Sequence, residues 1–283
     1  MKRILVPLLG DAGDRPALDL ATNVARRRGA HIDAMLFRRD PRDMIPLVGE
    51  GFNAAMIDSV VEAAEAQSVA REKAARATYA SWREASGISD DGASSRPSAS
   101  FSAVTAALPG AIARPARVAD LTVFARTEAD DGQERAGLVE VAMLDSGRPV
   151  LLAGSAPAGD VGRRVLIGWN GSAEAARAVA MAMPMLASAD AVTVVVVDDN
   201  GKSSETPDEL VHTLTLWGIA ATGRRVKVSR EGVAATLEAE AVTTNADMIL
   251  LGAYSHSRLR EFVMGGVTDD ALTGGAITMM LAR

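Results

Sequence analysis

A chain of 283 residues with 48% hydrophobic side chains is long enough for two ordinary domains and for well-packed cores. The net charge of -6 argues against a general nucleic-acid binder, and the absence of cysteine excludes disulfides, thiolate metal sites and cysteine nucleophiles. The apolar run between Met1 and Leu9 is too short for a signal peptide or a membrane span, so we expect a soluble, cytoplasmic protein that binds no membrane.

The N-terminal half predicts strands that alternate with helices. Its first strand is Arg3-Ile4-Leu5-Val6-Pro7, and an alanine-rich helix over Pro16 to Arg28 follows. The next elements are a strand over His31 to Phe37, a helix over about Asp58 to Ala85, a strand over Ala99 to Val104, a helix over Pro109 to Arg117, a strand over Ala119 to Phe124, a last helix, and a strand over Pro149 to Leu152.

The C-terminal half repeats this plan after a Gly/Ser/Pro-containing segment, Gly154 to Gly162, which is interpreted as a linker. Its first strand, Arg164-Val165-Leu166-Ile167-Gly168, echoes the run that begins at Arg3. The elements after it are a helix over Ala173 to Ala187, a strand over Ala191 to Val197, a helix over about Pro207 to Trp217, a strand over Arg224 to Val228, a helix over Val233 to Asn245, a strand over Ala246 to Leu251, a last helix, and a strand over Ile277 to Leu281.

Five strands alternating with four helices, twice over, predict an α/β fold with two tandem domains, residues 1–154 and 163–283. Each domain is expected to be a five-stranded, mostly parallel sheet with helices on both faces, in a Rossmann-like arrangement. The duplication predicts an intramolecular pseudo-dimer. The sequence leaves open whether two chains also form a homodimer.

The stretch from Asp247 to Thr268 has the pattern of an anion site. A buried apolar strand stops at Gly252, and glycine returns at Gly265 and Gly266, where backbone N–H groups could face a phosphate. Simpler readings stand beside this one: Gly252 could only turn the chain, the later glycines could serve as a flexible joint, and Asn170-Gly171 is a good turn on local propensity alone. The sequence therefore favours a small anionic ligand without naming a reaction.

In these residues the chain resembles the universal stress proteins, in their tandem form. The resemblance rests on Ile167-Gly168-Trp169-Asn170-Gly171-Ser172 and on Gly252-Ala253-Tyr254-Ser255-His256-Ser257-Arg258 leading to Gly265-Gly266-Val267-Thr268. Nucleotide-binding members carry Gly-x-x-Gly, nine residues, then Gly followed by Ser or Thr, with an acidic residue after the first strand. Here Ser255 replaces a glycine, Gly266 replaces the hydroxyl residue, and Asn170 stands where the acidic residue would be.

The resemblance implies an adenine-nucleotide alpha-hydrolase-like fold and an ATP-associated stress-response role. The adenine would lie near Val197 and the ribose near Asn170, with Gly171 and Ser172 beside it. The phosphates would lie on the remaining candidate residues, which are Gly252, Ser255, His256, Gly265, Gly266, Val267 and Thr268. Magnesium is expected only through the nucleotide. A neutral Asn170 in place of a carboxylate would weaken binding about tenfold.

The equivalent site in the first half looks erased, because Leu9 matches Asn170 and the loop after Phe124 carries Glu128, Asp130 and Asp131. A second hypothesis is a protein that binds no nucleotide and works as an adaptor or dimerisation scaffold. A third is slow nucleotide hydrolysis, but no general base and no Gly-x-x-x-x-Gly-Lys-Ser/Thr loop accompany the glycines, so no catalytic residue is assigned. No metal site is expected either.

Overall fold

The computed structural model describes residues 1–38, 54–89, 97–126, 132–155, 159–198, 201, 205–253 and 275–283, with the backbone alone for residues 54–57 and 132–133. In the first half it contains β1 (Arg3–Leu8), α1 (Asp14–Arg28), β2 (His31–Arg38), α2 (Ala54–Ser86), β3 (Ser98–Thr105), a short 3-10 turn η2 (Gly110–Ile112) with α3 (Ala113–Arg117), β4 (Leu121–Ala125), α4 (Gly132–Asp145) and β5 (Val150–Ala153). These elements match the predicted order.

The second half follows the same order within its described residues. It contains β6 (Arg164–Gly168), α5 (Ala173–Leu186), β7 (Ala191–Asp198), α6 (Asp208–Leu216), β8 (Ala221–Lys227), α7 (Val233–Thr243), β9 (Met248–Gly252) and β10 (Thr278–Ala282). The last predicted helix of this half falls in residues 254–274, which lie outside the described residues.

All these strands lie in one ten-stranded sheet, in the order β3-β2-β1-β4-β5-β10-β9-β6-β7-β8. Equivalent strands of the two halves follow one another in reverse order across the sheet. Neighbouring strands are parallel except where β5 meets β10. There Leu152 pairs with Met279 and Val150 with Leu281, which makes the two predicted five-stranded sheets continuous. The α/β fold with a mostly parallel sheet is therefore confirmed.

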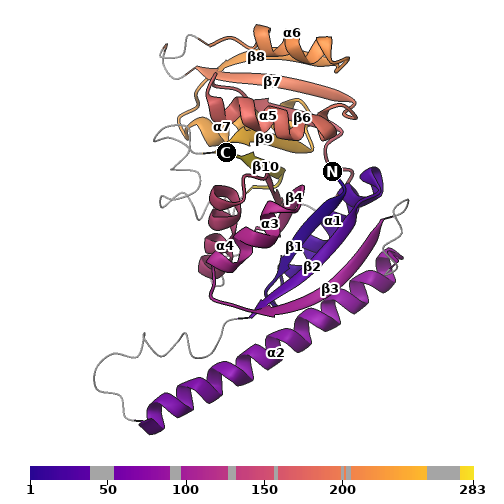
Figure 1. Cartoon of the computed structure of the whole chain (residues 1–283). Helices are drawn as coiled ribbons and strands as arrows, with labels where there is room; N and C mark the ends of the chain where they lie inside the picture. The colour runs from indigo at the N-terminus through magenta and orange to yellow at the C-terminus, as the bar shows by residue number, and fades with distance from the viewer. Residues whose placement is uncertain are drawn as a thin grey trace.

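Helices cover both faces of the sheet, as the fully apolar strands require (Figure 1). One core cluster joins the sheet to α1, α2, α5 and α6 through Leu18, Trp82, Ala178 and Leu210. A second cluster joins the opposite face to α3, α4 and α7, for example through Leu237. Because the side chains of the central strands are buried on both faces, these strands need no polar alternation, whereas the outer strands β3 and β8 are partly exposed.

The long helix α2 covers the sheet only with its C-terminal part. Ala75, Tyr79 and Trp82 are buried, whereas none of the described side chains from Asp58 to Ala74 is. The Nε1–H of Trp82 donates to Thr22 Oγ1 at 3.0 Å, which satisfies the polar atom of this buried ring. Figure 1 accordingly shows the N-terminal part of the 33-residue helix extending beyond the body of the molecule.

A repeated aspartate joins the start of the first strand to the start of the fourth in each half. Asp120 accepts the backbone N–H groups of Lys2 and Arg3, and Asp247 accepts those of Gly162, Arg163 and Arg164. The Ala-Asp pair that opens both predicted strands thus has one structural function: it satisfies donors at the amino edge of the sheet.

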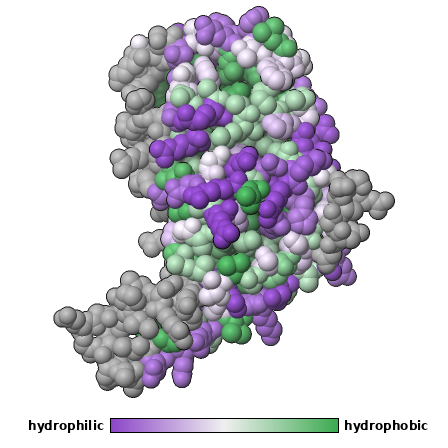
Figure 2. All heavy atoms as spheres, viewed as in Figure 1, coloured by the Kyte–Doolittle hydropathy of each residue, from purple (hydrophilic) through white to green (hydrophobic). Residues whose placement is uncertain are grey.

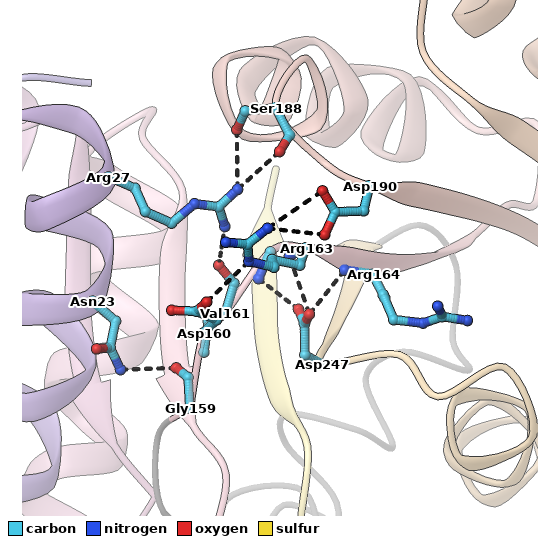
Figure 3. Close-up of polar contacts among 11 residues, drawn as sticks. Asn23, Arg27, Gly159, Asp160, Val161, Arg163, Arg164, Ser188, Asp190 and Asp247 are labelled. Atoms are coloured by element: carbon cyan, nitrogen blue, oxygen red, sulfur yellow. Dashed lines mark hydrogen bonds and ion pairs between the residues drawn. The ribbon is translucent and has the colours of Figure 1, made fainter.

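The end of the predicted linker, from Gly159 to Val161, is hydrogen-bonded to α1 (Figure 3). Asn23 Nδ2 donates to the carbonyl of Gly159 at 2.9 Å, and Arg27 Nη1 donates to that of Val161 at 2.6 Å. Arg27 Nη2 also reaches the carbonyl of Ser188, just after α5, at 2.9 Å. One arginine of the first half therefore contacts both the linker and the second half. On the face drawn in Figure 2, hydrophilic residues gather in a band across the middle of the molecule.

Candidate functional site

In the second half, the strand order reverses between β6 and β9. The chain runs from β6 outward to β7 and β8 and then returns to β9 and β10 on the other side of β6. In open α/β sheets, small ligands bind where the strand order reverses in this way. Gly168, the last residue of β6, pairs with Val195 of β7 and Leu251 of β9. This register brings Asn170, Val197 and Gly252 to the same edge of the sheet.

The segment Asn170 to Ser172 forms a tight turn between β6 and α5. Gly171 has φ +70°, a conformation that is unfavourable for residues with a side chain. Asn170 Oδ1 accepts two hydrogen bonds from Ser172, one from the backbone N–H at 3.2 Å and one from the hydroxyl at 2.7 Å. Ser172 is the N-cap of α5, and its Oγ accepts the N–H of Ala175 at 3.2 Å. The prediction of a local turn at Asn170-Gly171 is therefore confirmed, and this turn lies at the carboxyl edge of the sheet.

Glu174, in the first turn of α5, also caps the helix. Its carboxylate accepts a hydrogen bond from the backbone N–H of Glu174 itself, and this bond, together with Arg177 at 2.8 Å, lowers the pKa of the carboxyl. The N–H of Ala175 donates to Ser172 Oγ, so two of the terminal N–H donors of the helix are used internally. A phosphate would therefore gain less at this helix end than at an uncapped one.

Gly252 has a packing role that the sequence did not reveal. A Cβ built on it would overlap the backbone of Glu174 and Ala175, so the start of α5 lies directly against the end of β9. Its φ is not positive, so the backbone conformation there does not itself require glycine. Its absent side chain sets the distance between α5 and the sheet, and its contact with phosphate stays a prediction.

Val197 provides an apolar surface at the end of β7. It is partly buried and packs against the core cluster on the α7 side of the sheet, as do Val226 of β8 and Val233 at the start of α7. The next residue, Asp198, is paired with Arg225 at 3.2 Å and accepts the N–H of Gly201 at 2.9 Å. The strand end is thus held by polar contacts beside partly buried aliphatic side chains.

The remaining candidate residues lie outside the described part of the chain. These are Ser255, His256, Gly265, Gly266, Val267 and Thr268. The structure thus describes Asn170, Gly171, Ser172, Val197 and Gly252, which share one edge of the sheet, and it leaves the phosphate loop as a prediction.

One acidic residue at this edge was missed by sequence reasoning. A Cβ built on Gly171 would lie 2.6 Å from both carboxylate oxygens of Glu205, which is partly buried. Glu205 belongs to the connection between β7 and α6, so the fold brings it to the β6–α5 turn from 34 residues away in the sequence. No motif around it marks it, because only the course of that connection decides the contact.

The equivalent edge of the first half is filled by protein side chains. Arg135, in the first part of α4, is only 2% exposed and pairs with Asp11 in the β1–α1 loop. Gly10 is equally closed off, because a Cβ on it would overlap the backbone of Arg71 in α2. Arg71 in turn pairs with Glu134 at 2.9 Å.

Two features of this filled edge are energetically costly. Arg135 is buried, yet within the described residues its Nε and Nη1 have no hydrogen-bond partner. Asp14 is fully buried and accepts the N–H groups of Leu9 and Gly10, both at 2.9 Å. Burial raises the pKa of Asp14 to about 6, and the neighbouring Asp11 adds to the rise.

The sequence predicts that the carboxylates of Glu128, Asp130 and Asp131 repel phosphate, and these residues lie outside the described part of the chain, so that reason stays a prediction. The described residues add a separate feature, the Arg135 guanidinium paired with Asp11 and the α2 backbone against Gly10. No helix among the described residues is long and apolar enough to cross a membrane.

Comparison with known proteins places this fold. No protein-family model matches the chain, and no curated protein sequence does. Among solved structures, a universal stress protein from Archaeoglobus fulgidus DSM 4304 superposes with a TM-score of 0.64 at 15% identity, covering 99% of this chain and 96% of that one. A putative universal stress protein from Pseudomonas aeruginosa UCBPP-PA14 superposes with a TM-score of 0.55 at 14% identity over 100% and 93%. The whole chain therefore has the fold of full-length universal stress protein structures.

Proposed function

We propose that this chain is a stress-response protein of the universal stress type, whose second half binds an adenine nucleotide such as ATP or AMP weakly. The nucleotide is the small anionic ligand, magnesium enters only with it, and the protein works in the cytoplasm. The fold alone does not carry this proposal, because one fold supports many functions. The observation that carries it is local: the described residues of the candidate site meet at the point where the strand order reverses.

The contrast between the two halves supports the same proposal. At the first edge, a Cβ on Gly10 would overlap the helix backbone at Arg71, whereas at the second a Cβ on Gly171 would meet the side-chain carboxylate of Glu205. An aliphatic side chain at Val197 suits an adenine ring, and an oxygen acceptor at this edge suits a ribose. The first edge is thus closed by backbone, and the second is met by an acidic side chain.

Thermal unfolding with and without ATP tests the proposal. A ligand at about 100 times its dissociation constant stabilises the folded state by about 2.7 kcal/mol, which for a chain of this size raises the melting midpoint by about 5 °C. We expect such a rise with millimolar ATP and Mg²⁺ and none with Mg²⁺ alone. Asn170→Asp restores a charged acceptor while keeping the turn geometry, so it should enlarge the shift.

A second function, a scaffold that binds no nucleotide, is favoured by two specific observations. Ser172 and Glu174 cap the start of α5 internally, and the end of α6 exposes Leu216 and Trp217, by 74% and 69%. Exposed large apolar side chains beside the edge strand β8 suit a protein contact. This function predicts no ATP-dependent shift, together with concentration-dependent association in sedimentation that Trp217→Ser weakens.

A further inference from the structure

The carboxylate of Glu205 is held in place at the β6–α5 turn. Pro207, two residues further on, is buried against β8, where a Cβ on Gly223 would lie 2.7 Å from its ring Cγ. Proline also restricts the residue before it to extended conformations. These two restraints fix the backbone at Thr206 and Pro207, directly after Glu205, whose carboxylate lies against Gly171.

The carboxylate also has a defined orientation. Both of its oxygens are the same distance, 2.6 Å, from the Cβ position of Gly171, so the group faces the turn rather than touching it with one oxygen. The turn stands at the N-terminus of α5, where the helix dipole favours negative charge. The absence of a side chain at Gly171 is what admits the acid.

The chemistry of this corner is that of a hydroxyl receptor. An ionised carboxylate only accepts hydrogen bonds, and it matches the O–H donors of a sugar diol. Near Glu205, the amide oxygen of Asn170 already accepts the N–H and the hydroxyl of Ser172, and the Glu174 carboxylate is bonded by its own N–H and Arg177, so the assignment concerns Glu205 alone. A carboxylate repels phosphate oxygens, which are negatively charged and bind to hydrogen-bond donors.

We propose that Glu205 accepts the ribose hydroxyl hydrogen bonds of the nucleotide, and so supplies from another loop the charged acceptor that Asn170 lacks. This inference rests on the proposed nucleotide binding in the second half. It predicts selectivity for a ribose over a sugar without hydroxyls, because a site built to bond a hydroxyl discriminates strongly against the analogue that lacks it.

Isothermal titration calorimetry with ATP and with 2′,3′-dideoxy-ATP, both with Mg²⁺, tests the assignment on the full chain. We expect wild type to prefer ATP. In Glu205→Gln the ATP dissociation constant should rise about tenfold, while that of the dideoxy analogue should change less than twofold. Glu205→Asp, which keeps the charge, should restore part of the preference. Glu209→Gln, an exposed acid in the first turn of α6, is the matched control and should leave both constants unchanged.

The outcomes separate this inference from the function on which it rests. If wild type binds neither nucleotide, the proposed function fails. If ATP binds but Glu205→Gln keeps the wild-type preference for ATP, only the role of Glu205 is overturned. If Glu205→Gln binds ATP more tightly than wild type, the carboxylate excludes phosphate instead of accepting ribose, and the assignment is again overturned. Equal melting midpoints for wild type and the glutamine variant, without nucleotide, establish that the variant is folded.

Discussion

The buried pair between Arg135 and Asp11 makes a prediction that depends on pH. Replacing Arg135 by methionine keeps most of the side-chain volume but leaves the Asp11 carboxylate beside Asp14 without its cation. Removing one partner of a buried ion pair costs about 3–5 kcal/mol. The substitution also relieves two buried N–H groups of Arg135 that lack partners, which returns about 1–3 kcal/mol.

The net loss expected for Arg135→Met is therefore about 2 kcal/mol at pH 8, or a fall of about 4 °C in melting midpoint. At pH 5 the loss should be smaller, because the Asp14 carboxyl, with its pKa raised to about 6, is then protonated and no longer repels Asp11. The double variant Asp11→Asn, Arg135→Met should recover part of the stability, because Asp11 then carries no unpaired charge, while at pH 8 the buried Asp14 carboxylate still lacks the Arg135 cation.

Urea unfolding at pH 5 and pH 8 measures both effects. Arg15→Met is the control, because Arg15 and Asp19 form an ion pair of the same kind on the surface, where each side chain is 45% exposed. Exposed pairs contribute about 0–1 kcal/mol, so its loss should be small at either pH. Wild-type stability for Arg135→Met at pH 8, or a double variant less stable than the single one, would refute this account of the first-half edge.

Three further predictions concern stability. Because the pKa of Asp14 is about 6 in the folded chain and returns to its ordinary 3.8 on unfolding, the contribution of Asp14 to wild-type stability should fall by about 2 kcal/mol as pH rises from 4 to 7, and Asp14→Asn should flatten that pH profile. Gly252→Ala should destabilise the chain by about 1–3 kcal/mol in chemical unfolding, whereas Gly110→Ala, whose Cβ would meet nothing within 4 Å, should not. Arg27→Ala should accelerate limited proteolysis within residues 154–162, and an unchanged cleavage rate would show that its contacts do not hold that segment.

The packing of Gly252 matters for any experiment on the candidate phosphate loop. Substitution there is expected to disturb α5 as well as any ligand, because the missing Cβ lets helix and strand backbones approach. Loss of nucleotide binding in a Gly252 variant would therefore not identify a phosphate contact. Variants at Glu205 and Asn170 are more informative, since both can be changed to residues of similar size.

Most of the fold could be predicted from the sequence because the spacing of apolar residues, and the glycines and prolines that end an element, are local properties. Continuous β-branched runs such as Val192 to Val197 are typical of strands buried on both faces, and glycine or proline marks where they end. The repetition of this plan predicted two similar halves and helices on both faces. The antiparallel pairing of β5 with β10 could not be predicted in the same way, because nothing in Leu152 or Met279 specifies which edge of another sheet they meet.

In the candidate site, too, the local features could be predicted from the sequence and the long-range contacts could not. Asn170, Gly171 and Ser172 stand out in the sequence because a turn and a helix cap use short-range signals that adjacent residues carry. Glu205 at Gly171, Arg135 at Asp11 and the start of α5 on Gly252 were decided only by tertiary structure. Each of these contacts joins residues more than 30 positions apart, and the path of the intervening backbone, which no local pattern encodes, sets whether they meet.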